Sequence, residues 1–437
     1  MKLYNIKQHN EQVTLTTALL QGLGKNRGLF FPIRLPKFSE DEINNLLSMN
    51  FIERSANILS EYIGAELSKN IILDCVKNAF NIPLPLVRIN NRISILELFH
   101  GPTLAFKDFG CRLLAQFLNK IYNTRNNNKP MVILTATSGD TGAAVAHAFF
   151  NLSNIYVVIL YPKHKISTFQ EKLFCTLGKN IYTISVDGDF DACQNLIKQA
   201  FSDDLLQKRL ALNSANSINI GRILAQICYY FEGVSQVSSE LRKKLVISVP
   251  SGNFGNLTAG LLAQSCGLPV KKFVVATNIN NTVPRFLRYG YWDPHPSVST
   301  FSNAMDVSCP NNWPRIEELF RRDNRSITEL EYDYVEDHIT KNTIQFIADL
   351  GYLSEPHTAI AYKVLSDKLN ANEFGMCIGT AHPVKFKKLI ESFFCNKIKI
   401  ILPLSLQKYV KLPTLSYDIP KCFFSLRNLI LKIISES

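Results

Sequence analysis

Lys107 lies between two phenylalanines, Phe106 and Phe109, in the segment ELFHGPTLAFKDFG that spans residues 97–110. Apolar surroundings disfavour the ammonium form of a lysine, so the neutral and nucleophilic amine becomes easier to reach. The same pattern also fits a surface lysine at the start of a helix, with its methylene stem packed on the aromatic rings. The segment taken alone leaves both interpretations open.

Small polar residues follow apolar runs at three further places: TSGDTG at 137–142, SGNFGN at 251–256 and GTAHP at 379–383. Each is followed by a helix-like segment. At the start of a helix the free N–H groups and the positive end of the dipole attract an anion, and glycine lets the backbone approach closely. One such junction is also what a tight structural turn uses. Two of them after buried strands predict two anions, such as a cofactor phosphate and an acidic substrate.

The elements that must position these residues are indicated by continuous apolar or β-branched runs. Continuous rather than alternating hydrophobicity means that both faces of a strand are buried, which is typical of parallel strands covered by helices. We therefore expect an α/β fold. The runs are 132–136, 155–160, 181–186, 245–249, 273–276 and 376–378.

Residues 1–85 have a different hydrophobic pattern, with helix-like spacing in place of continuous apolar runs. Helix-like apolar spacing at 40–50, 51–63 and 68–80, with Ser39 as an N-cap, predicts a mostly helical accessory domain. We assign 86–400 to a second region, which contains the Lys107 segment and the three junctions. The proline-containing tail 401–437 is expected to form a C-terminal wrap that ends in a helix.

Composition excludes several classes of protein. The 437 residues suffice for two or three domains, and no run reaches the roughly 18 to 20 apolar residues of a membrane span. The first residues lack the apolar run of a secretory signal, so we expect a cytoplasmic protein without a membrane partner. Neither the ten cysteines nor the eight histidines fall at metal-ligand spacing, so no metal is expected and the thiols are expected to be reduced.

The net charge of +12 raises the possibility of a nucleic-acid partner. The Lys and Arg residues are spread along the chain rather than gathered into a stripe, so no nucleic-acid partner is expected. A positive field also favours anionic small molecules.

Five segments, in their order along the chain, resemble those of the threonine synthases, within the wider group of fold-type II pyridoxal-phosphate enzymes. They are HGPTLAFKDFG, ATSGDTGAAVAHAF, VPSGNFGN, NAMDVSCPNNWPR (303–315) and GTAHPVKF. The resemblance implies a fold like that of the tryptophan synthase β chain. Two α/β lobes with mostly parallel sheets, the smaller at roughly 110–240, would stand beside the N-terminal accessory domain.

The resemblance also assigns roles to residues. Lys107 would be the Schiff-base lysine of pyridoxal 5′-phosphate, and Thr380 would present its hydroxyl to the pyridine nitrogen. The cofactor phosphate would be held by Gly252, Asn253, Phe254 and Gly255. The loop over the substrate would contain Ser138, Asp140 and Thr141, with Ser138 and Thr141 donating to the carboxylate or phosphate of the substrate.

The implied reaction is the last step of threonine biosynthesis, in which O-phospho-L-homoserine and water give L-threonine and phosphate by γ-elimination and β-addition of water. Lys107 would move the protons. A serine or threonine dehydratase is the alternative within the same class, and a non-catalytic phosphate-ligand or RNA-binding α/β protein is the alternative outside it. Candidates for gripping the substrate phosphate are Lys163, Arg285 and Arg315.

Two residues depart from the pattern expected of the family. Cys111 stands where a small residue such as glycine is expected, and Asn256 where an aspartate is also familiar. The oligomeric state, monomer or homodimer, is left open.

Overall fold

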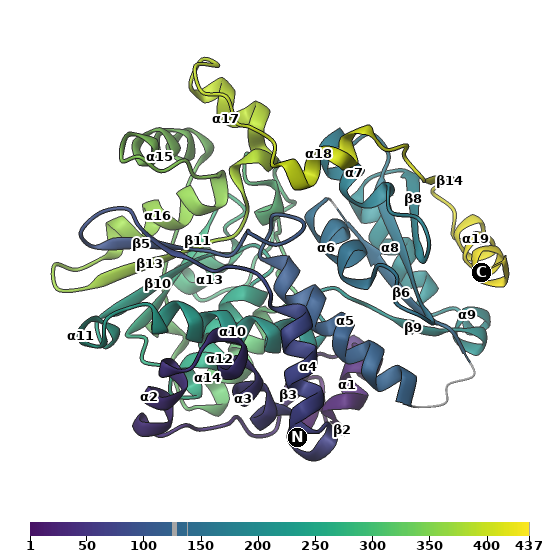
Figure 1. Cartoon of the computed structure of the whole chain (residues 1–437), viewed down its shortest axis with the longest axis horizontal. Helices are drawn as coiled ribbons and strands as arrows, with labels where there is room; N and C mark the ends of the chain where they lie inside the picture. Colours follow the sequence, from purple (N-terminus) through teal and green to yellow (C-terminus); the bar gives the residue numbers. More distant parts are fainter. Residues whose placement is uncertain (125–128, 138, 437) are drawn as a thin grey trace.

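The computed structural model of the chain describes residues 1–124, 129–137 and 139–436. Its strands form three sheets: a small N-terminal one, a six-stranded one and a five-stranded one. Figure 1 shows the lobe built on the six-stranded sheet at the left, the lobe built on the five-stranded sheet at the right, and the N-terminal segment below them. Two sheets with helices on their faces agree with the expected α/β class.

The N-terminal segment contains the three expected helices and the expected N-cap, together with one feature that was not expected. Helices α2 (Glu40–Ser48), α3 (Phe51–Ile63) and α4 (Lys69–Ala79) lie close to the predicted ranges. Ser39 begins α2 with a capping box, because its hydroxyl accepts from the Glu42 N–H while the Glu42 carboxylate accepts from the Ser39 N–H at 2.8 Å. The unexpected feature is an antiparallel sheet, which precedes these helices together with a short helix: β1 (Lys2–Asn5), β2 (Gln8–Thr14), β3 (Phe30–Pro32) and α1 (Leu15–Gln21).

The larger lobe has the strand order β12-β11-β10-β13-β5-β4, and all neighbours are parallel except the edge pair of β4 and β5. The strands are β4 (Leu86–Arg88), β5 (Ile93–Glu97), β10 (Leu245–Pro250), β11 (Lys272–Thr277), β12 (Glu331–Tyr334) and β13 (Phe374–Gly379). The helices of this part are α10 (Ile220–Ser235), α11 (Ser239–Arg242), α12 (Gly255–Ser265), α13 (Thr282–Tyr289), α14 (Trp313–Arg322), α15 (Asp337–Asp349), α16 (Pro356–Lys368) and α17 (Lys387–Phe393).

The smaller lobe has five strands, all parallel, in the order β14-β8-β7-β6-β9. They are β6 (Met131–Ala136), β7 (Ile155–Pro162), β8 (Ile181–Asp187), β9 (Ala211–Asn213) and β14 (Tyr417–Pro420). The helices are α5 (Lys107–Thr124), α6 (Asp140–Phe149), α7 (Thr168–Cys175), α8 (Phe190–Ala200) and α9 (Asp204–Arg209).

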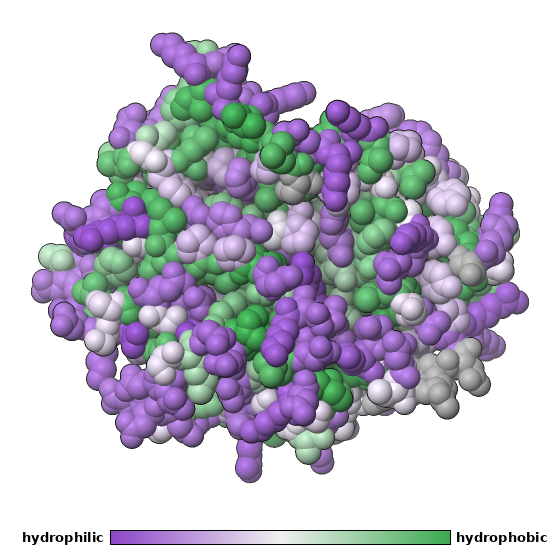
Figure 2. Space-filling view, viewed as in Figure 1, coloured by the Kyte–Doolittle hydropathy of each residue, from purple (hydrophilic) through white to green (hydrophobic). Residues whose placement is uncertain are grey.

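Both faces of this sheet are covered, which explains the continuous apolar runs. Along β6, Met131 and Ile133 join the main hydrophobic core, whereas Val132 and Leu134 join a second core on the opposite face. Helix α6 packs on one face and α8 on the other. Figure 2 shows the result at the surface: hydrophilic residues make up most of this side of the molecule, with hydrophobic ones in smaller patches between them.

The tail from residue 401 crosses from the larger lobe to the far edge of the smaller one (Figure 1). It contains α18 (Leu404–Lys411), then β14, which pairs in parallel with β8, and finally α19 (Phe423–Glu436), which packs on α8. The boundaries at 85 and 400 and the range 110–240 for the smaller lobe stay predictions. Helix α10, within that range, packs against both α5 and α12.

Candidate active site

The predicted site residues lie at the carboxyl ends of parallel strands, where open α/β sheets bind their ligands. The junctions follow β6, β10 and β13, and α5 begins at Lys107 itself. Lys107 is brought beside Thr380 by backbone pairing. The Phe106 N–H donates to the Thr380 carbonyl at 2.9 Å, and Ala105 forms an antiparallel bridge with Ala381.

Lys107 is a mostly buried lysine, with 17% of its side chain exposed, so it does not match the surface interpretation. Its Nζ lies 5.4 Å from the centre of the Phe106 ring and 3.7 Å from Asp140 Oδ2. Burial lowers the pKa of Lys107; Asp140 opposes that shift, while Lys385 and Arg222 add to it. The surroundings therefore favour the neutral, nucleophilic form of the amine.

The loop between β10 and α12 presents free backbone donors. Phe254 adopts a left-handed conformation with φ of 60° and begins α12 without a side-chain cap. The N–H groups of residues 252–257 donate to no other described residue, whereas the N–H of Ser251 donates to the Ala276 carbonyl at 2.8 Å. A row of unpaired N–H groups at the start of an eleven-residue helix fits an anion such as a phosphate group.

The segment 303–315 packs against this loop. A Cβ on Gly252 would lie 2.7 Å from Met305 Cα, so only glycine permits the approach. The Asn253 side chain accepts from the Asn311 N–H at 2.6 Å, and the Asn312 amide donates to the Asn253 carbonyl at 3.1 Å. Gly255 is less tight, since the nearest atom to an added Cβ is the tip of a flexible isoleucine at 3.2 Å.

Thr380 directly follows β13 and is 6% exposed. Its carbonyl is used by Phe106, but its hydroxyl makes no hydrogen bond to any residue in the described part of the chain. Thr380 is a buried residue, but its hydroxyl is not enclosed by the protein, so it is available as a donor or acceptor to a ligand.

The loop that begins α6 is held by Thr137, whose hydroxyl accepts from the N–H groups of Gly139 at 2.9 Å and Gly142 at 2.8 Å. Ser138 lies outside the described residues. Thr141 is in the first turn of α6 and half-buried.

Asp140, the first residue of α6, faces cations. Its Oδ1 lies 2.7 Å from Lys385 Nζ and accepts from the Gln170 amide at 3.2 Å, while its Oδ2 faces Lys107. Burial alone would raise the pKa of Asp140, but Lys385 and Lys107 hold it well below its usual range. The carboxylate is therefore ionised and engaged by the protein itself.

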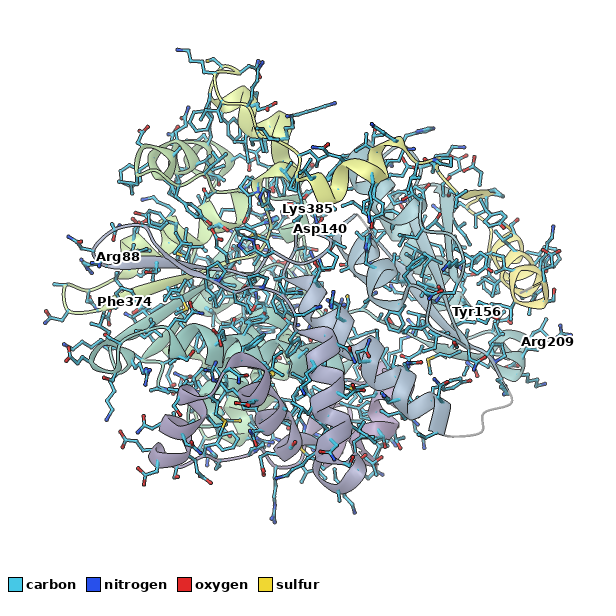
Figure 3. The ribbon with its side chains drawn as sticks, in the orientation of Figure 1. Arg88, Asp140, Tyr156, Arg209, Phe374 and Lys385 are labelled. Atoms are coloured by element: carbon cyan, nitrogen blue, oxygen red, sulfur yellow. The ribbon has the colours of Figure 1, made fainter. Side chains whose placement is uncertain are left out.

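Two cations near Lys107 were not predicted from the sequence. The Lys385 side chain has no exposed surface, and Figure 3 labels it beside Asp140 where the two lobes meet. Lys385 belongs to the GTAHPVKF segment, which was the available signal. Arg222 lies outside the segments that resemble those of the family. Its Nε is buried without a partner, its other end donates to the Ala215 carbonyl at 2.5 Å, and no described carboxylate pairs with it.

The three candidates for gripping a substrate phosphate are otherwise engaged. Lys163 pairs with Asp418 at 2.8 Å, and Arg285 with Asp293 at 3.1 Å. Arg315 is fully buried and donates to the Ser217, Ile218 and Phe30 carbonyls. The structure brings none of them into contact with Lys107 or Asp140.

Cys111 and Asn256, the two residues that depart from the family pattern, are both accommodated by their buried surroundings. Cys111 is fully buried on α5, where burial raises the pKa of its thiol to about 11, so it remains a neutral thiol. The Asn256 side-chain oxygen accepts from the Tyr229 hydroxyl at 2.5 Å and the Tyr230 hydroxyl at 2.7 Å. Asn256 therefore anchors the first turn of α12 to α10.

No helix in the described ranges is long and apolar enough to cross a membrane. The same residues contain no group of three His, Cys, Asp or Glu side chains that would hold a metal ion.

Comparison with known proteins places this site in a family. Residues 81–376 match the family of pyridoxal-phosphate dependent enzymes, and residues 4–80 match the threonine synthase N terminus. The chain is 58% identical over 431 residues to threonine synthase from Serratia marcescens, covering 99% of each.

Two solved structures with a similar fold belong to the same family. The crystal structure of threonine synthase from Escherichia coli has a TM-score of 0.94 and 57% identity, covering 99% of this chain and 100% of that one. The pyridoxal-phosphate-bound threonine synthase from Brucella melitensis has a TM-score of 0.92 and 29% identity, covering 98% of both. The fold and the matches thus define a pyridoxal-phosphate-dependent enzyme of fold type II. Within that class, the chain belongs to the threonine synthase family.

Proposed function

We propose that the chain converts O-phospho-L-homoserine and water to L-threonine and phosphate, with Lys107 as the lysine that carries pyridoxal phosphate. The observation that carries the proposal is that a desolvated lysine, the hydroxyl of Thr380 and the N–H groups of residues 252–257 lie at the carboxyl ends of the strands, and that this hydroxyl and these N–H groups have no partner among the described residues. When bound, pyridoxal phosphate supplies an electron sink for reactions at the carbons of an amino-acid substrate.

The binding roles follow from the donors that are free. Gly252, Asn253, Phe254 and Gly255 hold the cofactor phosphate through their N–H groups at the start of α12. Thr380 offers its hydroxyl to the ring nitrogen. A hydroxyl is neutral, so it leaves that nitrogen largely unprotonated, whereas a carboxylate would favour the protonated form.

Lys107 is the proton carrier. Its Nζ accepts the proton from the substrate Cα and then serves the proton transfers at Cβ. Burial lowers the pKa of Lys107, and this direction suits the role, because a base must be unprotonated to accept a proton.

The substrate loop remains part of the proposal. Ser138 and Thr141 donate to the carboxylate or phosphate of the substrate. Asp140 does not bind these groups, because its ionised carboxylate would repel them; it faces Lys107 and Lys385 instead.

The first experiment is the absorbance spectrum of the purified protein with and without O-phosphohomoserine. We expect a visible band that disappears on borohydride reduction, and peptide mass spectrometry should locate the reduced cofactor on Lys107. A colourless protein that binds RNA in a salt-sensitive manner would instead support the non-catalytic alternative.

The second experiment compares Lys107→Ala with Lys388→Ala, an exposed lysine of α17. Lys107→Ala should abolish release of phosphate and formation of threonine, and Lys388→Ala should preserve both. Turnover at the wild-type rate by Lys107→Ala would refute the role of Lys107. If the wild type released ammonia and a 2-oxoacid from threonine but no phosphate from O-phosphohomoserine, the dehydratase alternative would hold.

We infer further that the enzyme works in the cytoplasm on a small-molecule substrate, without a nucleic-acid partner. The dispersed positions of its 48 Lys and Arg residues support the absence of a nucleic-acid partner. Its oligomeric state is monomer or homodimer, and sedimentation equilibrium distinguishes the two by mass.

A further inference from the structure

Lys385 contacts two groups that lie near Lys107, the Asp140 carboxylate and the Thr103 carbonyl. On one side its Nζ contacts Asp140 Oδ1 at 2.7 Å, and the other oxygen of that carboxylate faces Lys107. On the other side Lys385 Nζ donates to the Thr103 carbonyl at 2.8 Å. Thr103 in turn donates its N–H and hydroxyl to Asp108, the residue after Lys107, at 2.9 and 2.7 Å.

These contacts join the two lobes. Lys385 follows β13 of the larger lobe, and Asp140 begins α6 of the smaller lobe, so the pair lies where the lobes meet (Figure 3). The Lys385 side chain is 0% exposed and that of Asp140 is 7% exposed. Screening by water and salt is therefore weak, and the charge of one group acts strongly on the next.

The charges around Lys107 can be counted. Asp140 from α6, Lys385 from the segment after β13, Arg222 from α10 and Cys111 from α5 act on its amine. Cys111 is neutral, because burial raises the pKa of its thiol to about 11. Arg222 pairs with no described carboxylate, and within this set of four Asp140 supplies the only negative charge.

We propose that Lys385 is a positioning residue that neutralises Asp140 so that Lys107 works as an uncharged amine. With neutral Lys107, the group of Lys107, Asp140 and Lys385 has no net charge. With the ammonium form, the buried group carries one positive charge, which is unfavourable in a dry site. Without Lys385 the balance reverses, because Asp140 would then be compensated only by the ammonium form of Lys107.

The inference rests on the proposed role of Lys107, and it predicts an order among variants. With neutral Lys107 the group carries +1 in Asp140→Asn, zero in the wild type, zero in the double variant Asp140→Asn/Lys385→Met, and −1 in Lys385→Met. The pH at which Lys107 becomes reactive should rise in that order. His357 lies close enough to affect Asp140 and is present in all four proteins, so it does not alter the order.

The test measures recombination of the cofactor-free enzyme with pyridoxal phosphate, followed by the growth of visible absorbance between about pH 6 and about pH 10. Only the neutral amine reacts with the aldehyde, so the rate reports the protonation of Lys107 without any turnover. We expect the midpoint for Lys385→Met to rise by about one pH unit, which makes recombination about tenfold slower below the midpoint. Lys388→Met, which alters an exposed lysine three residues along the chain, should leave the midpoint unchanged.

The double variant distinguishes an effect of charge on the midpoint from an effect of lost packing. It should return the midpoint of Lys385→Met toward the wild-type value, and Asp140→Asn should lie below both. Because the double variant buries no unpaired carboxylate, it remains available if Lys385→Met is too unstable to purify.

Equal midpoints for the wild type and Lys385→Met, or for Asp140→Asn and the double variant, would overturn the proposal. If the wild-type protein itself developed no visible band, the proposed function would fail instead, and the two failures are distinguishable.

Discussion

Arg54 on α3 contacts Glu232 on α10, with the guanidinium Nη1 2.5 Å from the carboxylate Oε2. Arg54 is 2% exposed, and its guanidinium also donates to carbonyls at the end of α2, including that of Leu46 at 2.7 Å. The pair therefore joins the N-terminal helices to the helix that packs between the lobes.

Arg54→Met is expected to lower the free energy of unfolding by about 3 to 5 kcal/mol, because it leaves the Glu232 carboxylate without its cation and the carbonyls of Leu47 and Met49 without a donor. Urea denaturation followed by circular dichroism measures this. The matched control is Lys243→Met, which removes an exposed ion pair with Glu40 and should change stability by less than about 1 kcal/mol. Equal losses in the two variants would contradict the buried role of Arg54.

Thr137→Val is expected to destabilise the loop before α6. The substitution keeps the shape of the side chain but removes the oxygen that accepts from Gly139 and Gly142, so two buried N–H groups lose their partner. A loss of about 1 to 3 kcal/mol is expected in the same denaturation measurement. Thr328→Val, at an exposed site, should stay within about 0.5 kcal/mol of the wild type.

Gly252→Ala is expected to weaken binding of pyridoxal phosphate. The added Cβ would stand 2.7 Å from the backbone of Met305, so the loop or the segment 303–315 must shift. We expect the dissociation constant, from titration of the cofactor-free protein, to rise at least about tenfold, which corresponds to about 1.4 kcal/mol. Gly351→Ala strains a positive φ of 88° but meets no atom within 4 Å; it should leave cofactor affinity unchanged.

His147 predicts a pH dependence of stability. Burial lowers its pKa to about 4, and its Nε2 lies 2.8 Å from the Leu173 carbonyl. As the pH falls from about 6.5 to about 4, the unfolded chain binds a proton that the folded chain does not, so the free energy of unfolding decreases.

His147→Gln keeps an amide donor for Leu173 but does not titrate. Between those pH values the wild type should lose about 2 to 3 kcal/mol more than this variant. Thermal or urea unfolding at several pH values measures the difference. His338→Gln, whose imidazole is 68% exposed, should follow the wild-type curve; parallel curves for His147→Gln and the wild type would refute the prediction.

Six of the eleven strands described in the two lobes were predicted from continuous apolar runs, because both of their faces are buried: β6, β7, β8, β10, β11 and β13. The apolar runs at 132–136 and 245–249 correspond to β6 and β10, and Ser39 marks the start of α2. Strands β1 and β2 escaped prediction, since β2 has one exposed face and reads as the polar sequence QHNEQVT. Strand β14 escaped because its pairing with β8 joins residues far apart in the chain.

Within the site, motifs located the loops but not the charges that act across them. Lys107, Thr380 and the loop at 251–256 stood out through local pattern. Lys385 was inside a recognised segment, yet its contact with Asp140 depends on how the two lobes meet. Arg222 sits in an ordinary amphipathic helix, and only its unpaired Nε distinguishes it.

The position of β14 has a consequence for how the chain folds during synthesis. Strand β8 is complete early, but the strand that covers its open edge comes from residues near 420. Until those residues leave the ribosome, β8 presents unpaired N–H and C=O groups to any other strand nearby. The smaller lobe is therefore most prone to aggregation as a nascent chain, and its protection arrives only after the residues of β14 have been translated.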